Sequence, residues 1–415
     1  TKVVAKRMDY HSPVGGIMST PIMTIPAQAV CFEAMIKMIR EQITHLVVQQ
    51  GSEYLGIISA HDIMVNQVAA PVVLLRDITS QTDLADLNLF YLRLPSIVRR
   101  LIEQGARAGH ILTLVALMND RFIIKVMNLI QKSLVPPPVR YTRLLFGEAG
   151  RKETGIYPPN DNGMVYDNVS DHVSVTLVQS YFQQMAFQVA NALQSCCSGP
   201  SRTRLCSSNP RWRMPVHSWK TYLRDAVLNP IPPDVFITKM ILDFRPLYGC
   251  EEMGQELREF ASCELKHAQT FKRMLATDFL SNAAPLTFFR DDALEIDGSK
   301  INSLDVQGRL VDPFANFARL MSFHYSIDQT NTLLRLEALA ETGIFSRSTI
   351  KDISNAYEFN VQLNILNQLK QLESGITPDS FMAVSDISNM ERLMLKDTFS
   401  VMAKMVEIVK NRFTN

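Results

Sequence analysis

The stretch that decides the fold spans residues 144–168 and reads LLFGEAGRKETGIYPPNDNGMVYDN. It opens as an apolar strand, passes through the glycine-bounded turn of residues 147–150, and continues through a polar loop to Asp161 and a second apolar strand. Backbone N–H groups at a glycine turn that starts a helix suit an anion. A carboxylate beside that turn is a ligand that Mg²⁺ prefers. The stretch therefore predicts a strand, helix-start and strand unit with its polar groups at one end.

This layout resembles the active-site signature of the nucleotidyltransferase superfamily. In that superfamily a Gly-Ser turn opens a helix that holds a nucleoside triphosphate, and a later Asp-x-Asp places two carboxylates on Mg²⁺. Phosphoryl-type transfer depends mostly on positioning and charge neutralisation. The resemblance implies that Gly147, Gly150 and Arg151 bind the nucleotide, with Arg151 on its phosphates. It also implies that Asp161 binds Mg²⁺ and takes part in catalysis.

Two positions depart from that signature. Glu148 stands where the superfamily has Ser, and Pro159 stands where it has the first Asp of the pair. Glu148 would bring a negative charge to the place of a triphosphate, and proline has no side chain that binds a metal. These departures indicate a degenerate catalytic signature. The alternative is that Glu148 turns toward the metal and replaces the missing carboxylate.

Composition limits the classes of protein that the chain can represent. Its 415 residues suggest two or three domains. The balance of 42 basic and 41 acidic residues argues against binding of nucleic acid or an anionic membrane by bulk charge. No apolar run reaches the roughly 20 residues that span a bilayer, and no signal peptide is evident. Six cysteines without a framework spacing favour a reducing, cytoplasmic setting.

Residues 1–70 predict a small α/β unit that resembles a CBS domain. Its strands are expected at residues 21–26, 44–48 and 54–59, and its first helix at residues 29–42. The segment Gly56-Ile57-Ile58-Ser59-Ala60-His61-Asp62 carries the resemblance, which implies that Ser59 contacts the phosphate and Asp62 the ribose of an adenine nucleotide. The alternative is that Ser59 caps the following helix with Asp62 as its partner.

CBS domains work in pairs, and residues 1–7 look like the end of a preceding CBS unit. We therefore expect residues 1–70 to be the second of a pair whose first member is truncated. A single CBS unit exposes apolar surface that its partner would cover, so we expect a homodimer.

The rest of the chain predicts three further segments. Residues 71–135 are expected to form a helical connector, ending at the stiff Val135-Pro136-Pro137-Pro138 linker. Residues 136–260 are expected to form a mixed sheet with helices of the nucleotidyltransferase type. Residues 261–415 predict an antiparallel helical bundle, with late helices near 328–342, 347–373 and 386–411 and a helix start at Thr377-Pro378-Asp379. The fold class predicted for the whole chain is α+β.

Asp243 is the candidate for a third carboxylate in the nucleotidyltransferase-like segment. It stands in ILDFRPLYG, which we interpret as a strand, and the resemblance implies a role as catalytic base or metal ligand. The alternative is that Asp243 pairs with Arg245 or with a loop and only fixes the end of the strand.

Taken together, the motifs resemble the bacterial CBS-containing putative nucleotidyltransferases, which are related to the N-terminal region of PII-uridylyltransferase. The resemblance covers nearly the whole chain. It implies that the C-terminal bundle binds substrate, with recurring positions at Asp305, Arg319, Asn331 and Thr332. It also matches the retained signature residues Glu153 and Asn162.

Two functions follow from these observations. The first is a signal-transduction protein that senses an adenine nucleotide through its CBS module and has a degenerate transferase domain. The alternative is an active, Mg-dependent nucleotidyltransferase of the uridylyl- or adenylyltransferase kind, regulated by the CBS module, with Asp161 and Asp243 on the metal. A protein acceptor substrate belongs to this alternative.

Overall fold

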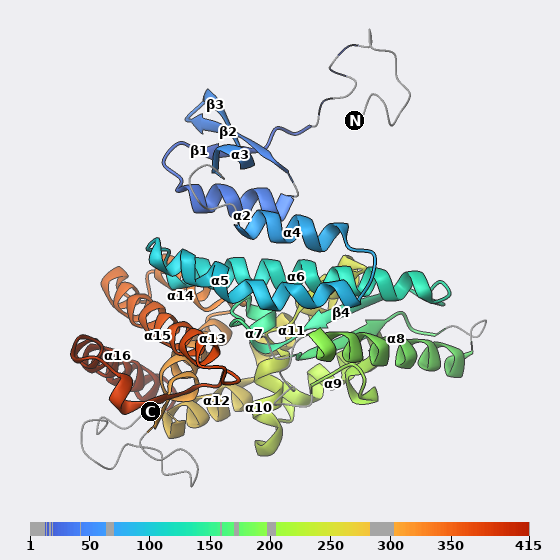
Figure 1. Ribbon diagram of the computed structural model, residues 1–415. Coiled ribbons are helices and arrows are strands. Elements are labelled where there is room, and N and C mark those ends of the chain that lie inside the picture. Colours follow the sequence, from blue (N-terminus) through green and yellow to red (C-terminus); the bar gives the residue numbers. More distant parts are fainter. Residues whose placement is uncertain are drawn as a thin grey trace. The chain divides into compact units, whose positions relative to one another are not determined.

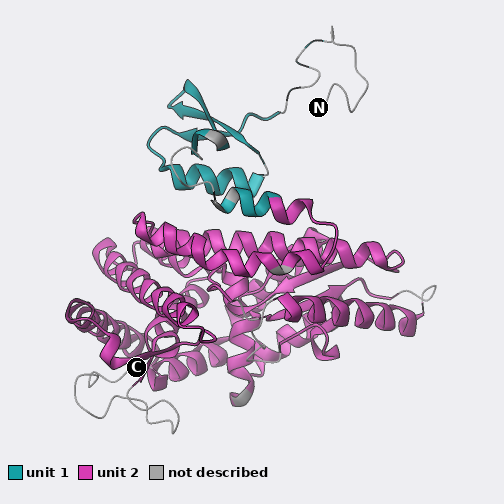
Figure 2. Ribbon diagram, viewed as in Figure 1, with its two compact units in different colours: residues 1–76 teal, residues 77–415 magenta. Residues whose placement is uncertain are grey.

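The computed structural model describes residues 13, 15, 18, 20–41, 43–63, 70–157, 160–169, 174–196, 205–282 and 303–414. The chain divides into two compact units, residues 1–76 and 77–415 (Figure 2). Both units combine helices with strands, so the α+β class predicted from the sequence is confirmed.

The first unit contains a three-stranded sheet in the order β1-β2-β3. Strand β1 (Thr24–Pro26) runs parallel to β2 (His45–Gln50), and β2 runs antiparallel to β3 (Glu53–Ser59). Gly51 adopts a φ of 62° in the turn between β2 and β3, a conformation that glycine takes without strain. The three strands lie where the sequence predicts them.

Helices complete the first unit. Helix α2 (Cys31–Glu41) joins β1 to β2 and buries one stripe of residues three or four apart: Ala34, Met35, Met38 and Ile39. The short helix α3 (Ala60–Ile63) follows β3 directly, and α4 (Ala70–Ser80) runs to the boundary with the second unit and past it. The helix predicted at residues 29–42 is confirmed as α2.

The second unit contains a four-stranded mixed sheet in the order β6-β5-β4-β7. Strand β4 (Tyr141–Leu145) runs antiparallel to both β5 (Asn162–Tyr166) and β7 (Arg245–Gly249), while β6 (Arg213–Pro215) runs parallel to β5. Every residue of β4 and β5 is buried, as expected for strands covered on both faces.

Helices surround this sheet (Figure 1). They are α5 (Leu89–Glu103), α6 (Ala108–Ser133), α7 (Gly147–Arg151), α8 (Val175–Cys196), α9 (Val216–Leu228), α10 (Pro232–Ile241) and α11 (Glu251–His267), with 3₁₀ turns at Ala85–Asn88 and Pro210–Trp212. Tyr141 of β4 donates a hydrogen bond to Gln131 of α6 and packs against Phe182 of α8. Trp219 of α9 donates to the carbonyl of Met164 in β5. Among the described residues, no helix combines the length and the apolarity needed to cross a membrane.

The C-terminal part is mainly helical. It contains α12 (Gln269–Asn282), α13 (Asp312–His324), α14 (Thr332–Glu341), α15 (Arg347–Glu373) and α16 (Asn389–Phe413). A two-stranded antiparallel sheet pairs β8 (Ser303–Asp305) with β9 (Phe381–Ala383), a π-helical turn follows β8 at Gln307–Val311, and a 3₁₀ turn follows β9 at Val384–Asp386. The three late helices are confirmed.

The helix start predicted at Thr377-Pro378-Asp379 is wrong. Helix α16 begins at Asn389, where Ser388 and Glu391 form a reciprocal capping box. Asp379 instead accepts hydrogen bonds from the backbone N–H of Phe381 and the side chain of Gln371, and thereby holds the entry to β9.

Candidate functional site

Three segments of the second unit meet at one end of its sheet. Leu145, the last residue of β4, is the register partner of Asn162 in β5 and of Arg245 in β7. The N–H of Phe146 donates to the carbonyl of Asp161 at 3.0 Å, so the start of α7 lies directly beside Asp161. The glycine turn, Asp161 and the approach to β7 thus come together, as the strand, helix-start and strand pattern predicts.

The backbone conformation and the packing of α7 explain why glycine occupies both positions. Gly147 adopts a φ of 53°, in the left-handed region. A Cβ on Gly150 would lie 1.9 Å from the carbonyl oxygen of Asp243, which no side chain can occupy. Glycine at both positions therefore lets α7 pack against the Asp243 turn. Nucleotide binding by these glycines stays a prediction.

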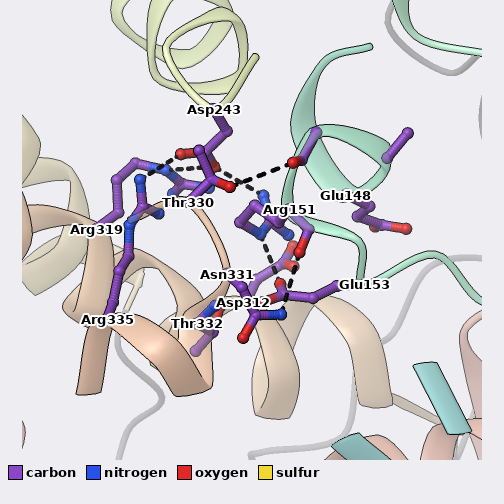
Figure 3. Close-up of polar contacts among 12 residues, drawn as sticks. Glu148, Arg151, Glu153, Asp243, Asp312, Arg319, Thr330, Asn331, Thr332 and Arg335 are labelled. Carbon is purple, nitrogen blue, oxygen red and sulfur yellow. Dashed lines mark hydrogen bonds and ion pairs between the residues drawn. The ribbon is translucent and has the colours of Figure 1, made fainter. Parts of the chain in front are cut away.

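Asp243 lies at the centre of an arginine cluster, drawn in Figure 3. Its Oδ2 accepts hydrogen bonds from Arg151 Nη1 at 3.0 Å and from Arg319 Nε and Nη2 at 2.9 and 2.6 Å. Its Oδ1 accepts from Arg335 Nη2 at 2.7 Å, and the residue is 0% exposed. Burial alone would raise the pKa of Asp243, but the charges of Arg319, Arg335 and Arg151 outweigh burial and hold it well below its usual value.

The structure corrects the prediction that Asp243 lies on a strand. Helix α10 extends to Ile241, Asp243 lies in the turn that follows, and β7 begins only at Arg245. The predicted alternative of a pairing with Arg245 is also wrong. Arg245 instead donates to Asp120 of α6 at 2.6 Å and to the carbonyl of Ala149 at 3.0 Å.

The retained residues Arg151 and Glu153 bind each other and the start of α14. Arg151 Nε donates to Glu153 Oε2 at 2.6 Å, and the N–H of Thr332 donates to Glu153 Oε1. Asn331 Nδ2 donates to the carbonyl of Arg151 at 3.1 Å. Burial alone would lower the pKa of Arg151, but Glu153 and Asp243 raise it well above its usual value. This set of contacts docks the C-terminal helices onto the signature segment.

Asp161 and Asn162 are both buried at the start of β5, with 2% and 0% exposure. Asn162 Oδ1 accepts from the N–H and the hydroxyl of Ser207, so Asn162 ties a distant loop to the strand. Pro159 lies outside the described residues. Within the described residues, no three His, Cys, Asp or Glu side chains are grouped so that they could hold a metal ion. The Mg²⁺ ligands predicted at Asp161 and Asp243 stay predictions.

A cavity of about 540 Å³ adjoins this cluster. Glu148, Arg151 and Glu153 line one side of it, together with Gly155 and Tyr157. One face of α15 and the segment after it also line the cavity: Tyr357, Val361, Asn364, Ile365, Gln368, Leu372 and residues 375–380. Leu112, Gln307 and Val311 complete the lining. A volume of this size is typical of small-molecule sites.

Three family models match the chain. Residues 14–68 match the model described as CBS domain, residues 92–233 the model described as Putative nucleotidyltransferase DUF294, and residues 269–413 the model described as Putative nucleotidyltransferase substrate binding domain. The chain belongs to the CBS-containing putative nucleotidyltransferases. No curated protein matches it.

The cluster of this family member joins both matched nucleotidyltransferase regions. Arg151 lies in the DUF294 region, Arg319 and Arg335 lie in the substrate-binding region, and Asp243 lies in the segment between them. Asp305, another predicted position of the substrate-binding domain, accepts a hydrogen bond from the N–H of Gly308 in the π-helical turn.

The predicted nucleotide half-site of the CBS domain adopts a helix-capping geometry. The N–H and hydroxyl of Ser59 both donate to Asp62 Oδ2, at 2.7 and 2.6 Å, and the N–H of Asp62 donates back to the Ser59 hydroxyl at 3.1 Å. The alternative that Ser59 caps α3 with Asp62 as its partner is therefore confirmed. Binding of an adenine nucleotide by the same two residues stays a prediction.

The sequence did not point to Arg335, Gln307, Asn364 or Gln368. Arg335 is 92 residues from Asp243 along the chain, and no local pattern relates the two. The amides of α15 could have been noticed in the sequence. Side-chain amides recur there at spacings of three and four, which places them on one helix face, and the buried face of a helix is normally apolar. They are Asn360, Asn364, Asn367, Gln368 and Gln371.

Proposed function

We propose that this protein is a signal-transduction protein in which a CBS module senses an adenine nucleotide and the nucleotidyltransferase-like domain no longer catalyses transfer. The environment of Asp243 is the observation that carries the second half of this proposal. Three guanidinium groups bind its two oxygens in a fully buried place. A divalent cation brought to Asp243 would meet three positive charges and would have to displace buried ion pairs, which costs several kcal/mol.

Glu148 supports the same conclusion. It lines the cavity beside α7, where the superfamily signature would place a triphosphate. Its Oε1 lies 3.4 Å from Gln307 Nε2, and Gln307 also donates to Asp312 at 2.8 Å. An anion at this place would face the Glu148 carboxylate, and Arg151 is already bonded to Glu153 and Asp243.

The alternative, an active Mg-dependent nucleotidyltransferase with a protein or small-molecule acceptor, rests on Asp161. Asp161 is retained and lies directly beside the start of α7. The test is a thermal-shift titration of ATP and UTP with and without Mg²⁺, for the wild-type protein and for Asp161→Ala. Metal-dependent stabilisation that disappears in the variant would favour the active enzyme and refute the proposal.

A double reversion tests whether Glu148 and Pro159 alone prevent Mg²⁺ binding or whether the arginine cluster prevents it as well. Glu148→Ser with Pro159→Asp restores the two signature residues while leaving the arginine cluster intact. If the arginines of Asp243 have closed the metal site, Mg²⁺ affinity measured by calorimetry stays unchanged. A clear gain in Mg²⁺ affinity would mean that those two residues alone had silenced the site.

The CBS half of the proposal rests on the CBS match and on Ser59 and Asp62. Both side chains lie at the start of α3, where a ribose hydroxyl or phosphate oxygen could exchange for the capping bonds. Calorimetric titration with AMP, ADP and ATP tests it. Heat that appears in the wild type and is lost in Asp62→Ala is expected, and no heat from any nucleotide would remove the sensing role.

We also propose that the protein is a homodimer and that it resides in the cytoplasm. The apolar side chains of Tyr54, Leu55 and Ile57 on β3 are 59%, 51% and 68% exposed, which is typical of a surface covered by a second copy. The five described cysteines form no disulfide, in keeping with a reducing compartment.

A further inference from the structure

The cavity beside Glu148 carries an inference that goes beyond the proposed function. Its lining includes three carboxylates, Glu148, Glu153 and Asp379. Arg151 is the one cation among the described lining residues, and its Nε and Nη1 are bonded to Glu153 and Asp243. The lining therefore has a net negative charge and holds its cation in place. A phosphate-bearing ligand does not fit this charge.

A chain of amides next to the cavity has a defined direction. Gln307 Nε2 donates to Asp312 Oδ1 at 2.8 Å and lies 3.4 Å from Glu148 Oε1, and both of these partners are carboxylates. The amide oxygen of Gln307 must then face the other way, and it accepts from Asn364 Nδ2 at 2.8 Å. The two carboxylates thus fix Gln307, and Gln307 fixes which end of Asn364 is its oxygen.

That direction leaves the oxygen of Asn364 without a donor. Asn364 Oδ1 is buried and has no hydrogen-bond partner, and Asn364 as a residue is 8% exposed. Gln368 Oε1, one turn later on the same face of α15, is also buried and without a partner. Gly155 leaves room for this second amide, because a Cβ there would lie 2.9 Å from Gln368 Oε1. Buried acceptors are rarely left unpaired in proteins, so two in one cavity wall indicate a missing donor.

The π-helical turn Gln307–Val311 supports a binding role for this wall. Turns of this kind are rare in proteins, and those that do occur are often found at functional sites. This one is stabilised by Asp305, which accepts the N–H of Gly308 at 3.0 Å, and it is Gln307 at its start that reaches both Glu148 and Asn364. The turn therefore places the amide that sets the polarity of the cavity.

Six aliphatic side chains also line the cavity, beside Tyr157, Tyr357, Thr377, Pro378 and Ser380: Leu112, Val311, Val361, Ile365, Leu372 and Ile376. Hydrocarbon beside a cluster of acceptors suits a ligand with a short alkyl chain and a charged N–H group at its end. We propose that this cavity binds a small organic cation, an alkylamine or alkylguanidine, with Asn364 Oδ1 and Gln368 Oε1 accepting its N–H groups and Glu148 balancing its charge.

The test is isothermal titration calorimetry of the full chain with agmatine and spermidine, and with inorganic phosphate as the anionic probe. Agmatine or spermidine should bind, and phosphate should not. Gln368→Leu should weaken binding about ten- to a hundred-fold, because a hydrogen bond to a charged group is lost. Asn364→Leu and Glu148→Gln should weaken it as well.

Gln362→Leu is the matched control. Gln362 is an amide on the same helix, but it is exposed and does not line the cavity. Its substitution should leave the affinity unchanged. Circular dichroism identifies any variant that fails to fold. If Asn364→Leu is unstable, the affinity of Gln368→Leu tests the proposal alone, because the oxygen of Gln368 has no hydrogen bond for the substitution to break.

Three results would overturn the proposal: no binding of either cation, binding that Gln368→Leu leaves unchanged, or competition by phosphate for the same site. The titration contains no nucleotide and no Mg²⁺. Its outcome is therefore independent of whether the transferase domain is active and of whether the CBS domain binds adenine nucleotides.

Discussion

Replacing Asp243 by Asn tests the arginine cluster most directly. The substitution keeps the shape of the side chain but removes the charge that Arg151, Arg319 and Arg335 share. Arg151 keeps Glu153 as a partner, whereas Arg335 keeps the uncharged carbonyl of Gln329. The variant therefore leaves buried positive charge without compensation.

The expected loss follows from that imbalance. Removing one partner from a buried ion pair costs about 3–5 kcal/mol. Asp243 accepts four charge-assisted hydrogen bonds, so we expect the loss to lie at the upper end, about 5 kcal/mol. Whole domains are stable by about 5–15 kcal/mol, so a large share of the stability of the second unit depends on this carboxylate.

Urea unfolding followed by tryptophan fluorescence measures the effect. The chain has two tryptophans, Trp212 and Trp219, and both are buried in the second unit. The matched control is Asp328→Asn, because the side chain of Asp328 is 55% exposed and also bonds an arginine, Arg258, at 3.0 Å. Its loss should stay below about 1 kcal/mol.

The pH dependence gives a second readout. Because the pKa of Asp243 in the folded protein lies below its unfolded value, its contribution is complete above the unfolded pKa of about 3.9 and is lost as the pH falls toward the folded value. The difference between wild type and Asp243→Asn should be constant from pH 8 to pH 5 and should shrink below about pH 4. A neutral or stabilising substitution without metal, or wild-type stabilisation by Mg²⁺ that the variant lacks, would refute the reasoning and favour a metal ligand.

Three further substitutions probe the packing of α7, a buried carboxylate and the exposed face of β3. Gly150→Ala should destabilise by about 1–3 kcal/mol in urea unfolding, because its Cβ would overlap the carbonyl of Asp243, whereas Gly56→Ala, with open space around it, should have little effect. Asp312→Asn should stabilise the protein at pH 8 and not at pH 4, because burial raises the pKa of Asp312 and disfavours its charge; equal stability of both proteins at pH 8 would contradict this. Ile57→Arg should shift the protein from dimer to monomer in analytical ultracentrifugation, with Val135→Arg, equally exposed in the linker, as control; a wild type that is already monomeric would remove the dimer proposal.

The parts of the fold that could be predicted are those that depend on local sequence patterns. The apolar stripe of α2 and the 27-residue α15 follow from spacings of three and four, and the glycine turn between two apolar strands correctly placed Asp161 beside α7. The apolar run before Asp243 predicts a strand but ends helix α10, because a short apolar segment fits a strand or a buried helix equally well. Pro232 at the first position of α10 favours the helix, since proline there loses no hydrogen bond.

The chemistry of the site could not be predicted in the same way. Arg319 and Arg335 are 76 and 92 residues from Asp243, so their pairing depends on how α13 and α14 dock against the turn after α10. A carboxylate in a sequence motif has the same appearance whether a metal or an arginine will face it. The neighbours that decide between the two come from other elements of the fold.

The distribution of charge at the end of the sheet supports the proposed function more strongly than either substituted residue does alone. A working transferase needs carboxylates that face a metal and cations that face phosphates. Here arginines surround Asp243, the carboxylate expected to bind metal, while Glu148 and Glu153 line the cavity expected to hold a triphosphate. A metal would meet cations and a nucleotide would meet acids. Restoring Ser and Asp at two signature positions would not reverse that arrangement, because Arg319 and Arg335 are supplied by the substrate-binding domain.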